Sequence, residues 1–203
     1  MSETQTQEVF LVDDDAAVRD AMGMLLESSG ISYRSFASAA EFLDDYNDDL
    51  RGCLVLDIRM SGMNGLELQS TLKSRKSTLP IIFITGHGDV PMAVEAMRLG
   101  ALDFMRKPIN ELNLLERIEQ ALSHEIDTRN QTLNEQQSKS KFDSLTQREQ
   151  QVFERVAEGQ ANKAIAFDLH ISERTVEVHR AQVMKKLEVA TLAQLVRVKI
   201  LLE

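Results

Sequence analysis

The sequence lacks the features that mark secreted and membrane-bound proteins. Cys53 is the only cysteine among the 203 residues and lies in the apolar run CLVL, so an internal disulfide is impossible and a buried thiol is expected. No apolar run approaches the roughly 18 residues that a transmembrane helix requires. The start of the chain, MSETQTQE, has neither the positive charge nor the apolar segment of a signal peptide. These absences predict a soluble, cytoplasmic protein without a membrane partner.

A shortage of positive charge is confined to the first part of the chain. The net charge is -9, and residues 1–124 hold 20 acidic and 11 basic side chains, whereas residues 125–203 hold 12 of each. A chain of 203 residues is long enough for one or two domains. The uneven charge favours two modules that have different partners.

Residues 1–124 have the pattern of an α/β domain. Helix-length amphipathic segments begin near residues 16, 39, 64, 90 and 111, and they alternate with five short apolar runs: EVFLV, ISYRSF, CLVLD, PIIFIT and LDFM. Strands that alternate with helices predict a parallel sheet with helices on both faces. We expect a doubly wound, flavodoxin-like sheet of five strands in the order 2-1-3-4-5.

The chain changes character in residues 125–142. This segment contains few apolar residues and no glycine or proline, and its helical spacing fades at the sequence QQSKSK. We interpret it as a linker in which the fifth helix is extended and then gives way to a flexible stretch. A short coiled-coil seam is the alternative.

Residues 143–203 predict a small all-α domain. Thr146 and Glu149 fit a capping box that opens a helix, and Gly159 is suited to end that helix. Ser172 is a good N-cap for a later helix that runs to about Leu187. No strand pattern returns after residue 143, so the two parts of the chain belong to different fold classes.

Three consecutive aspartates follow the first predicted strand, and Asp57 ends the third. In the expected strand order these two strands are neighbours at the point where ligands bind open α/β sheets. Close carboxylates cannot all ionise freely, and Mg²⁺ prefers carboxylate and water oxygens. We therefore expect Asp13, Asp14 and Asp57 to converge on Mg²⁺, whereas Asp15 is suited to the start of a helix.

Two further side chains belong to the same edge of the predicted sheet. The fourth strand ends in Thr85, and the fifth leads to Lys107. A hydroxyl and an ammonium group beside a magnesium-carboxylate cluster suit a dianionic phosphoryl group. A carboxylate can accept that group as an aspartyl phosphate.

The segments LVDDD, LVLDIRMSGMNG, ITGHGD and DFMRKPI together resemble the receiver domain of two-component response regulators, in order and spacing, over about 120 residues. The resemblance implies that Asp57 is the phosphoacceptor. It also implies that Asp13 and Asp14 hold Mg²⁺ together with Asp57, Asp14 more directly than Asp13, with the backbone carbonyl of Arg59 as a further ligand.

The same resemblance assigns roles to three residues near the expected site. Thr85 corresponds to the switch hydroxyl, Lys107 to the lysine that contacts the phosphoryl group, and Phe104 to the switch aromatic. For Phe104 the alternative is a core aromatic without a switching role. The Lys107–Pro108 bond is expected to be cis, as in similar proteins.

One position departs from the receiver pattern. Receivers of this kind usually have proline where this chain has Ser61. We expect a looser turn after Asp57, so the resemblance fixes the function but neither the exact metal geometry nor the lifetime of the phosphoryl group.

The segment LTQREQQVFERVAEGQANKAIAFDLHISERTVEVHRAQVMKKLEV resembles the helix-turn-helix of LuxR-type regulators over roughly 55 residues. The matching pieces are LTxRE, the spaced glycine, NKxIAxxL, ISxxTVxxH and the late KL. The segment ITGHGDVPMAVEAMRLGALDF resembles FixJ-like receivers, so the joint architecture resembles the NarL/FixJ class.

The helix from Ser172 is expected to enter the major groove of DNA. Its apolar face, made of Val176, His179, Val183 and Leu187, should point into the bundle. The side chains on the opposite side are candidates for base contacts: Arg174, Glu177, Val178, Ala181 and Lys185. Four residues are candidates for phosphate contacts: Asn162, Lys163, Thr175 and Lys186. The local charge of residues 172–187 is +2 from four basic and two acidic residues, so we expect specific binding to require a dimer.

These patterns predict a DNA-binding transcriptional response regulator, with a receiver in residues 1–124, a linker in 125–142 and a LuxR-type domain in 143–203. A sensor histidine kinase would donate the phosphoryl group, phosphorylation would promote a homodimer, and promoter DNA and RNA polymerase would be partners. The protein would not be an enzyme beyond catalysing its own aspartyl phosphorylation and dephosphorylation.

Two other hypotheses remain open from the sequence. A phosphohydrolase with an aspartyl nucleophile usually has a second acidic residue two positions after the nucleophile, but Arg59 stands there. The other hypothesis is a regulator that acts without phosphorylation and has a structural acidic pocket.

Overall fold

The computed structural model describes residues 6–86 and 90–202. Its N-terminal part is a parallel five-stranded sheet in the order β2-β1-β3-β4-β5, which confirms the predicted order. The strands are β1 (Glu8–Val12), β2 (Tyr33–Phe36), β3 (Gly52–Asp57), β4 (Ile81–Thr85) and β5 (Asp103–Arg106). The expected helices follow them in alternation: α1 (Ala16–Ser28), α2 (Ala39–Asp45), α3 (Gly65–Ser74), α4 (Val90–Arg98) and α5 (Glu111–Asp143).

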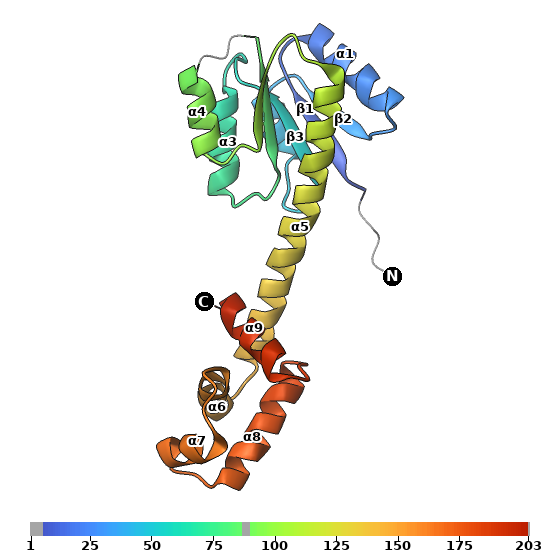
Figure 1. The fold of residues 1–203 in the computed structure, drawn as a ribbon. Coiled ribbons are helices and arrows are strands. Elements are labelled where there is room, and N and C mark those ends of the chain that lie inside the picture. The colour runs from blue at the N-terminus through green and yellow to red at the C-terminus, as the bar shows by residue number, and fades with distance from the viewer. Residues whose placement is uncertain (1–5, 87–89, 203) are drawn as a thin grey trace. The chain divides into compact units, whose positions relative to one another are not determined.

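Two apolar cores cover the two faces of this sheet. Side chains alternate along β1, so Val9 packs with α1 and α5 on one face while Phe10 packs with α2 and α3 on the other (Figure 1). Cys53 is fully buried, as expected, and burial raises the pKa of its thiol to about 12. The central strands are buried throughout their length, which leaves their carboxyl ends as the place where polar side chains can gather.

Gly65 sets the path of the loop that follows β3. A Cβ atom at this position would lie 2.4 Å from the carbonyl oxygen of Asp57, and the Gly65 N–H donates to the carbonyl of Ile58. Only glycine permits α3 to begin this close to the end of the strand. The loop between Asp57 and α3 is therefore held tightly at its far end.

The fully buried carboxylate of Glu125 fixes α5 at the amino ends of the strands, opposite to the end where Asp57 lies. Arg51 donates to Glu125 through Nε at 2.7 Å and Nη2 at 3.0 Å, and the side-chain amide of Gln7 donates to the same carboxylate at 2.7 Å. Glu125 is fully buried, while Arg51 and Gln7 precede β3 and β1. The hydrogen bond to Glu125 raises the pKa of Arg51.

The helix α5 continues further than the sequence pattern suggests. It includes the QQSKSK segment, where we expected the helix to give way to a flexible stretch, and ends at Asp143. The chain divides into two compact units, residues 1–129 and 130–203. The linker bounds 125–142 stay a prediction.

The second unit adds a bundle of short helices: α6 (Gln147–Ala157), α7 (Asn162–Leu169), α8 (Glu173–Lys186) and α9 (Leu192–Leu202). Thr146 and Glu149 form the expected capping box, and Ser172 caps α8 through the Thr175 N–H. Residues 144–202 contain no strand. Among the described residues of the whole chain, no helix is both long and apolar enough to span a membrane. His87 stands in the glycine loop TGHGD, where the sequence favours a structural or interface role, and it lies outside the described residues.

Replacing Arg51 by methionine should destabilise the first unit by about 2–4 kcal/mol, because Glu125 would remain buried without its cation. The measurement is urea unfolding followed by tyrosine fluorescence. Tyr33 and Tyr46 are the only tyrosines, and the chain has no tryptophan, so the signal reports this unit alone. The matched control is Arg98→Met, which breaks an exposed arginine–glutamate pair and should cost less than about 0.5 kcal/mol. Equal losses in the two variants would contradict the anchoring role of Arg51.

Candidate functional site

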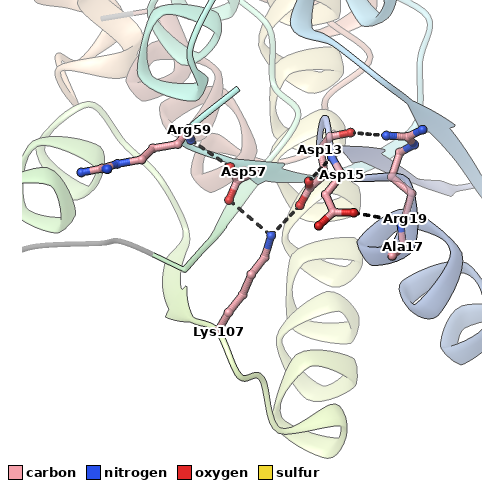
Figure 2. Close-up of polar contacts among 7 residues, drawn as sticks. All are labelled: Asp13, Asp15, Ala17, Arg19, Asp57, Arg59 and Lys107. Carbon is pink, nitrogen blue, oxygen red and sulfur yellow. Dashed lines mark hydrogen bonds and ion pairs between the residues drawn. The ribbon is translucent and has the colours of Figure 1, made fainter. Parts of the chain in front are cut away.

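Lys107 lies between two buried carboxylates at the carboxyl edge of the sheet. Val12 of β1 is opposite Leu56 of β3, so the residues that follow them, Asp13 and Asp57, emerge side by side. The Lys107 ammonium is 2.7 Å from Oδ2 of Asp13 and 3.5 Å from Oδ1 of Asp57 (Figure 2). Asp13 is 5% exposed and Asp57 is 7% exposed. The structure thus brings together three of the residues that the sequence indicated.

Backbone groups hold both carboxylates in place. The Arg59 N–H donates to Oδ2 of Asp57 at 2.9 Å, and the Asp15 N–H donates to Oδ1 of Asp13 at 2.9 Å (Figure 2). The side chain of Arg59 is exposed and extends away from Asp57. Each carboxylate thus keeps one oxygen on a backbone donor and turns the other toward Lys107.

The surroundings shift the acidity of Asp57 and Lys107. Burial raises the pKa of Asp57, and the negative charge of Asp13 adds to this, while Lys107 and the Arg59 N–H oppose it. Burial by itself lowers the pKa of Lys107, but its bonds and charge attraction to Asp13 and Asp57 outweigh burial, so the pKa is raised. Lys107 therefore remains an ammonium ion at neutral pH.

The other two aspartates of the triplet point elsewhere. Asp14 is exposed, and its Oδ2 accepts hydrogen bonds from the backbone N–H of Ser61 at 2.8 Å and from the Ser61 hydroxyl at 3.0 Å. Asp15 caps α1 by accepting a bond from the Ala17 N–H, which confirms its expected place at a helix start. Among the described residues, Asp14 has no hydrogen bond or ion pair with Asp13, Asp57 or Lys107, and its role as a metal ligand stays a prediction.

Thr85 bonds to the backbone of Lys107, and Phe104 lies in β5, three residues before Lys107. Thr85 ends β4, is 1% exposed, and accepts the Lys107 N–H through its carbonyl at 2.9 Å. Phe104 is half-buried in β5, where it lies opposite Phe83 and packs against the core. The Lys107–Pro108 bond is cis, as expected.

In the second unit, α8 has one buried and one exposed face. Val176, Val183 and Leu187 are buried as predicted, and His179 is half-buried. Val178 is 56% exposed, and the other candidates for base contacts are exposed as well: Arg174, Glu177, Ala181 and Lys185. These side chains form the accessible face of the helix that was predicted to enter DNA.

The four candidates for phosphate contacts have different surroundings. Lys163 is exposed, whereas Thr175 bonds to the cap residue Ser172, and Asn162 accepts a hydrogen bond from Arg180. Lys186 donates to the buried carboxylate of Glu149 at 2.7 Å.

Burial alone would raise the pKa of Glu149, but its bonds to Lys186 and Thr146 outweigh burial and lower it. The ammonium of Lys186 therefore has a structural role inside the bundle that the sequence did not indicate.

Comparison with known families matches both parts of the chain. Residues 9–119 match the model of the response regulator receiver domain, and residues 143–199 match that of the bacterial regulatory proteins of the luxR family. The chain belongs to the two-component response regulators. It is a transcription regulator with a receiver domain and a LuxR-type helix-turn-helix domain.

Relatives of this response regulator resemble it over nearly their whole length. The response regulator protein TodT of Pseudomonas putida is 45% identical over 94% of this chain and 84% of its own. The transcriptional regulatory protein FixJ of Azorhizobium caulinodans is 46% identical over 95% of this chain and 92% of its own. The solved structure of the response regulator StyR is 45% identical, with a TM-score of 0.84, and the match covers 96% of this chain and 98% of that one.

The oxygen donors of this response regulator fit magnesium in chemical type. Carboxylates and a backbone carbonyl are the hard ligands that Mg²⁺ prefers. Among residues 6–86 and 90–202, no three acidic, histidine or cysteine side chains lie close enough together to hold a metal ion. Asp13 and Asp57 share Lys107, and Oδ2 of Asp14 accepts its hydrogen bonds from Ser61.

Ionisation of Asp57 should weaken the folded receiver. Because its pKa is raised above 3.8, folded Asp57 holds its proton more tightly than the unfolded chain does, and stability is lost as pH rises through the interval above 3.8. The variant Asp57→Asn cannot lose a proton there. Its melting temperature should exceed that of the wild type by a few degrees at pH 7, and the difference should shrink toward pH 4; about 1 kcal/mol corresponds to roughly 4 °C in a domain of this size.

The measurement is thermal unfolding followed by tyrosine fluorescence between pH 4 and 8, without divalent cations. The control is Asp44→Asn, which removes an exposed carboxylate of α2 and should leave the melting temperature nearly unchanged. A constant offset between Asp57→Asn and the wild type at every pH would show that the effect does not come from ionisation.

Proposed function

We propose that this response regulator is switched by phosphoryl transfer to Asp57 from a sensor histidine kinase, with Mg²⁺. The observation that carries the proposal is the position of Lys107, whose ammonium lies 2.7 Å from Asp13 and 3.5 Å from Asp57 in a buried cluster. A cation in this place can neutralise the charge of a transferring phosphoryl group.

The two oxygens of Asp57 have different roles in the proposed transfer. Oδ2 is held by the Arg59 N–H, so Oδ1, on the side of Lys107, is the nucleophile. An Oδ1–P bond forms as the bond between phosphorus and the histidine nitrogen of the kinase breaks. The electron pair of that bond stays on the nitrogen, and Asp57 becomes an acyl phosphate.

The neighbouring residues would then adjust to the added charge. Mg²⁺ would be held by Asp13, Asp14, Asp57 and the Arg59 carbonyl, and it would supply positive charge to the phosphoryl oxygens. Lys107 would exchange its bond to Asp57 for one to the phosphoryl group. The Thr85 carbonyl accepts a hydrogen bond from the backbone N–H of Lys107, so Thr85 lies next to Lys107. The Thr85 hydroxyl is the proposed second donor to the phosphoryl group.

The proposed response is a population shift of the receiver surface formed by α4, β5 and α5. Phe104 lies in β5 within this region and is the proposed switch aromatic. The shift would promote a homodimer, which places two copies of α8 on two half-sites of promoter DNA. A neutral DNA-binding unit with a few basic residues on α8 needs two copies for strong binding. RNA polymerase is the proposed partner at the promoter.

Incubation with a small acyl phosphate and Mg²⁺ should add a single phosphoryl group to the wild-type chain. Intact-mass measurement would detect the adduct, and hydroxylamine should remove it because acyl phosphates react with that nucleophile. Asp57→Asn should give no adduct. Sustained turnover of phosphomonoesters would instead support a phosphohydrolase, and an unmodified wild-type chain would support a regulator that works without phosphorylation.

Replacing Lys185 by alanine should weaken promoter binding about tenfold or more, since an exposed basic residue on the groove-facing side of α8 is lost. Lys163→Ala should instead reduce the salt dependence of promoter binding. The slope of log K against log salt concentration should fall by about one unit per protomer, with little effect on sequence preference. Binding is measured by fluorescence anisotropy of labelled promoter DNA at several salt concentrations. Lys139→Ala, an exposed lysine of α5, is the control for loss of charge alone and should bind like the wild type. Similar losses in Lys139→Ala and Lys185→Ala would contradict the assignment of α8.

A further inference from the structure

Ser61 makes two hydrogen bonds to one oxygen of a proposed metal ligand. Its backbone N–H and its hydroxyl both donate to Oδ2 of Asp14, at 2.8 Å and 3.0 Å. The two residues are 47 positions apart, so the bonds join the loop after β1 to the loop after β3. We propose that Ser61 is a positioning residue that orients Asp14 for Mg²⁺ and thereby sets the affinity of the site for the metal. This inference rests on the proposed function of the site.

The asymmetry of these bonds is the first argument. Both donors of Ser61 are on Oδ2, and Oδ1 of Asp14 accepts no hydrogen bond from the described part of the chain. Mg²⁺ is small, demands near-octahedral geometry and is usually bound through one or two carboxylates together with water. A carboxylate with one oxygen fixed by two donors presents the other oxygen in a defined direction, which suits single-oxygen coordination.

The electrostatic balance of the loop is the second argument. Lys107 binds Asp13 and Asp57 and forms no ion pair with Asp14 in the described part of the chain. The hydrogen-bond partner of Asp14 there is Ser61. Partners of this kind, which contact a ligand rather than the metal, commonly change metal affinity by about 10- to 100-fold when they are removed.

The location of the bonds separates this role from a role in folding. Asp14 and Ser61 are both exposed, so water can replace these hydrogen bonds in a variant at little cost to stability. The far end of the loop is held independently by Gly65 against the end of β3. Loss of the Ser61 hydroxyl should therefore alter metal binding without unfolding the receiver.

Three substitutions at Ser61 separate the contributions of its two hydrogen bonds to Asp14. Ser61→Ala removes the hydroxyl but keeps the N–H, Ser61→Thr keeps both donors, and Ser61→Pro removes both. Affinity is measured on the full chain with Mn²⁺, whose free ion is followed by electron paramagnetic resonance, and with Mg²⁺ as the competitor. Ser74→Ala, an exposed serine at the end of α3, is the matched control for loss of a hydroxyl.

We expect Ser61→Ala to bind Mg²⁺ roughly tenfold more weakly than the wild type, Ser61→Pro to bind it more weakly still, and Ser61→Thr and Ser74→Ala to bind it within about twofold of the wild type. Melting temperatures without metal should stay within about 2 °C of the wild type for the alanine and threonine variants. An affinity of Ser61→Ala equal to or higher than that of the wild type overturns the proposal.

The outcomes distinguish this inference from the proposed function. A wild-type chain that is phosphorylated on Asp57 while Ser61→Ala keeps its metal affinity overturns the role of Ser61 alone. Weaker binding by Ser61→Ala in a chain that accepts no phosphoryl group overturns the proposed function and supports the role of Ser61. A wild-type chain that binds neither Mg²⁺ nor Mn²⁺ overturns the metal part of both.

Discussion

The ammonium group of Lys107 between Asp13 and Asp57 is the interaction on which the carboxylate cluster at the carboxyl edge of the sheet depends. Two carboxylates that are nearly buried at adjacent strand ends repel each other, and neither can be solvated freely. A shared cation makes the arrangement tolerable, but only if three separate segments meet with the right register. The strand order puts β1 beside β3, and the bond between the Lys107 N–H and the Thr85 carbonyl places the lysine at the same edge. The ion pairs of Lys107 with Asp13 and Asp57 thus require this strand order.

Features with short-range signals could be predicted from the sequence. Apolar runs gave the strands, and side chains that bond within three residues gave the caps at Asp15, Thr146 and Ser172. The apolar pattern of α5 fades before the helix ends, so the pattern alone predicts too short a helix. Gln, Lys and Ser without Gly or Pro do not end a helix, and the helix continues through them to Asp143.

The polar pairs that join distant segments could not be predicted in the same way. The partners are 47 residues apart in the pair Asp14–Ser61, 74 in Arg51–Glu125 and 37 in Lys186–Glu149. No local pattern in the sequence links such partners. The sequence around Glu125 does contain a signal that this carboxylate is buried and paired. Glu125 follows Leu114, Ile118 and Ala121 on the buried stripe of α5, and a charged residue on an apolar stripe requires a buried partner. The identity of that partner still depends on the fold.

The contacts of α5 also constrain how the receiver can respond at Asp57. The helix begins four residues after Lys107, close to the cluster, and at the other end of the sheet Glu125 is held by Arg51 and Gln7. Sliding along its axis would break a buried ion pair, which is costly. By contrast, β5 is an edge strand with a half-buried Phe104, and α4 has only Ala96 fully buried. In the proposed response, this asymmetry favours β5 and α4 as the elements that move, with α5 as the fixed support against which they move.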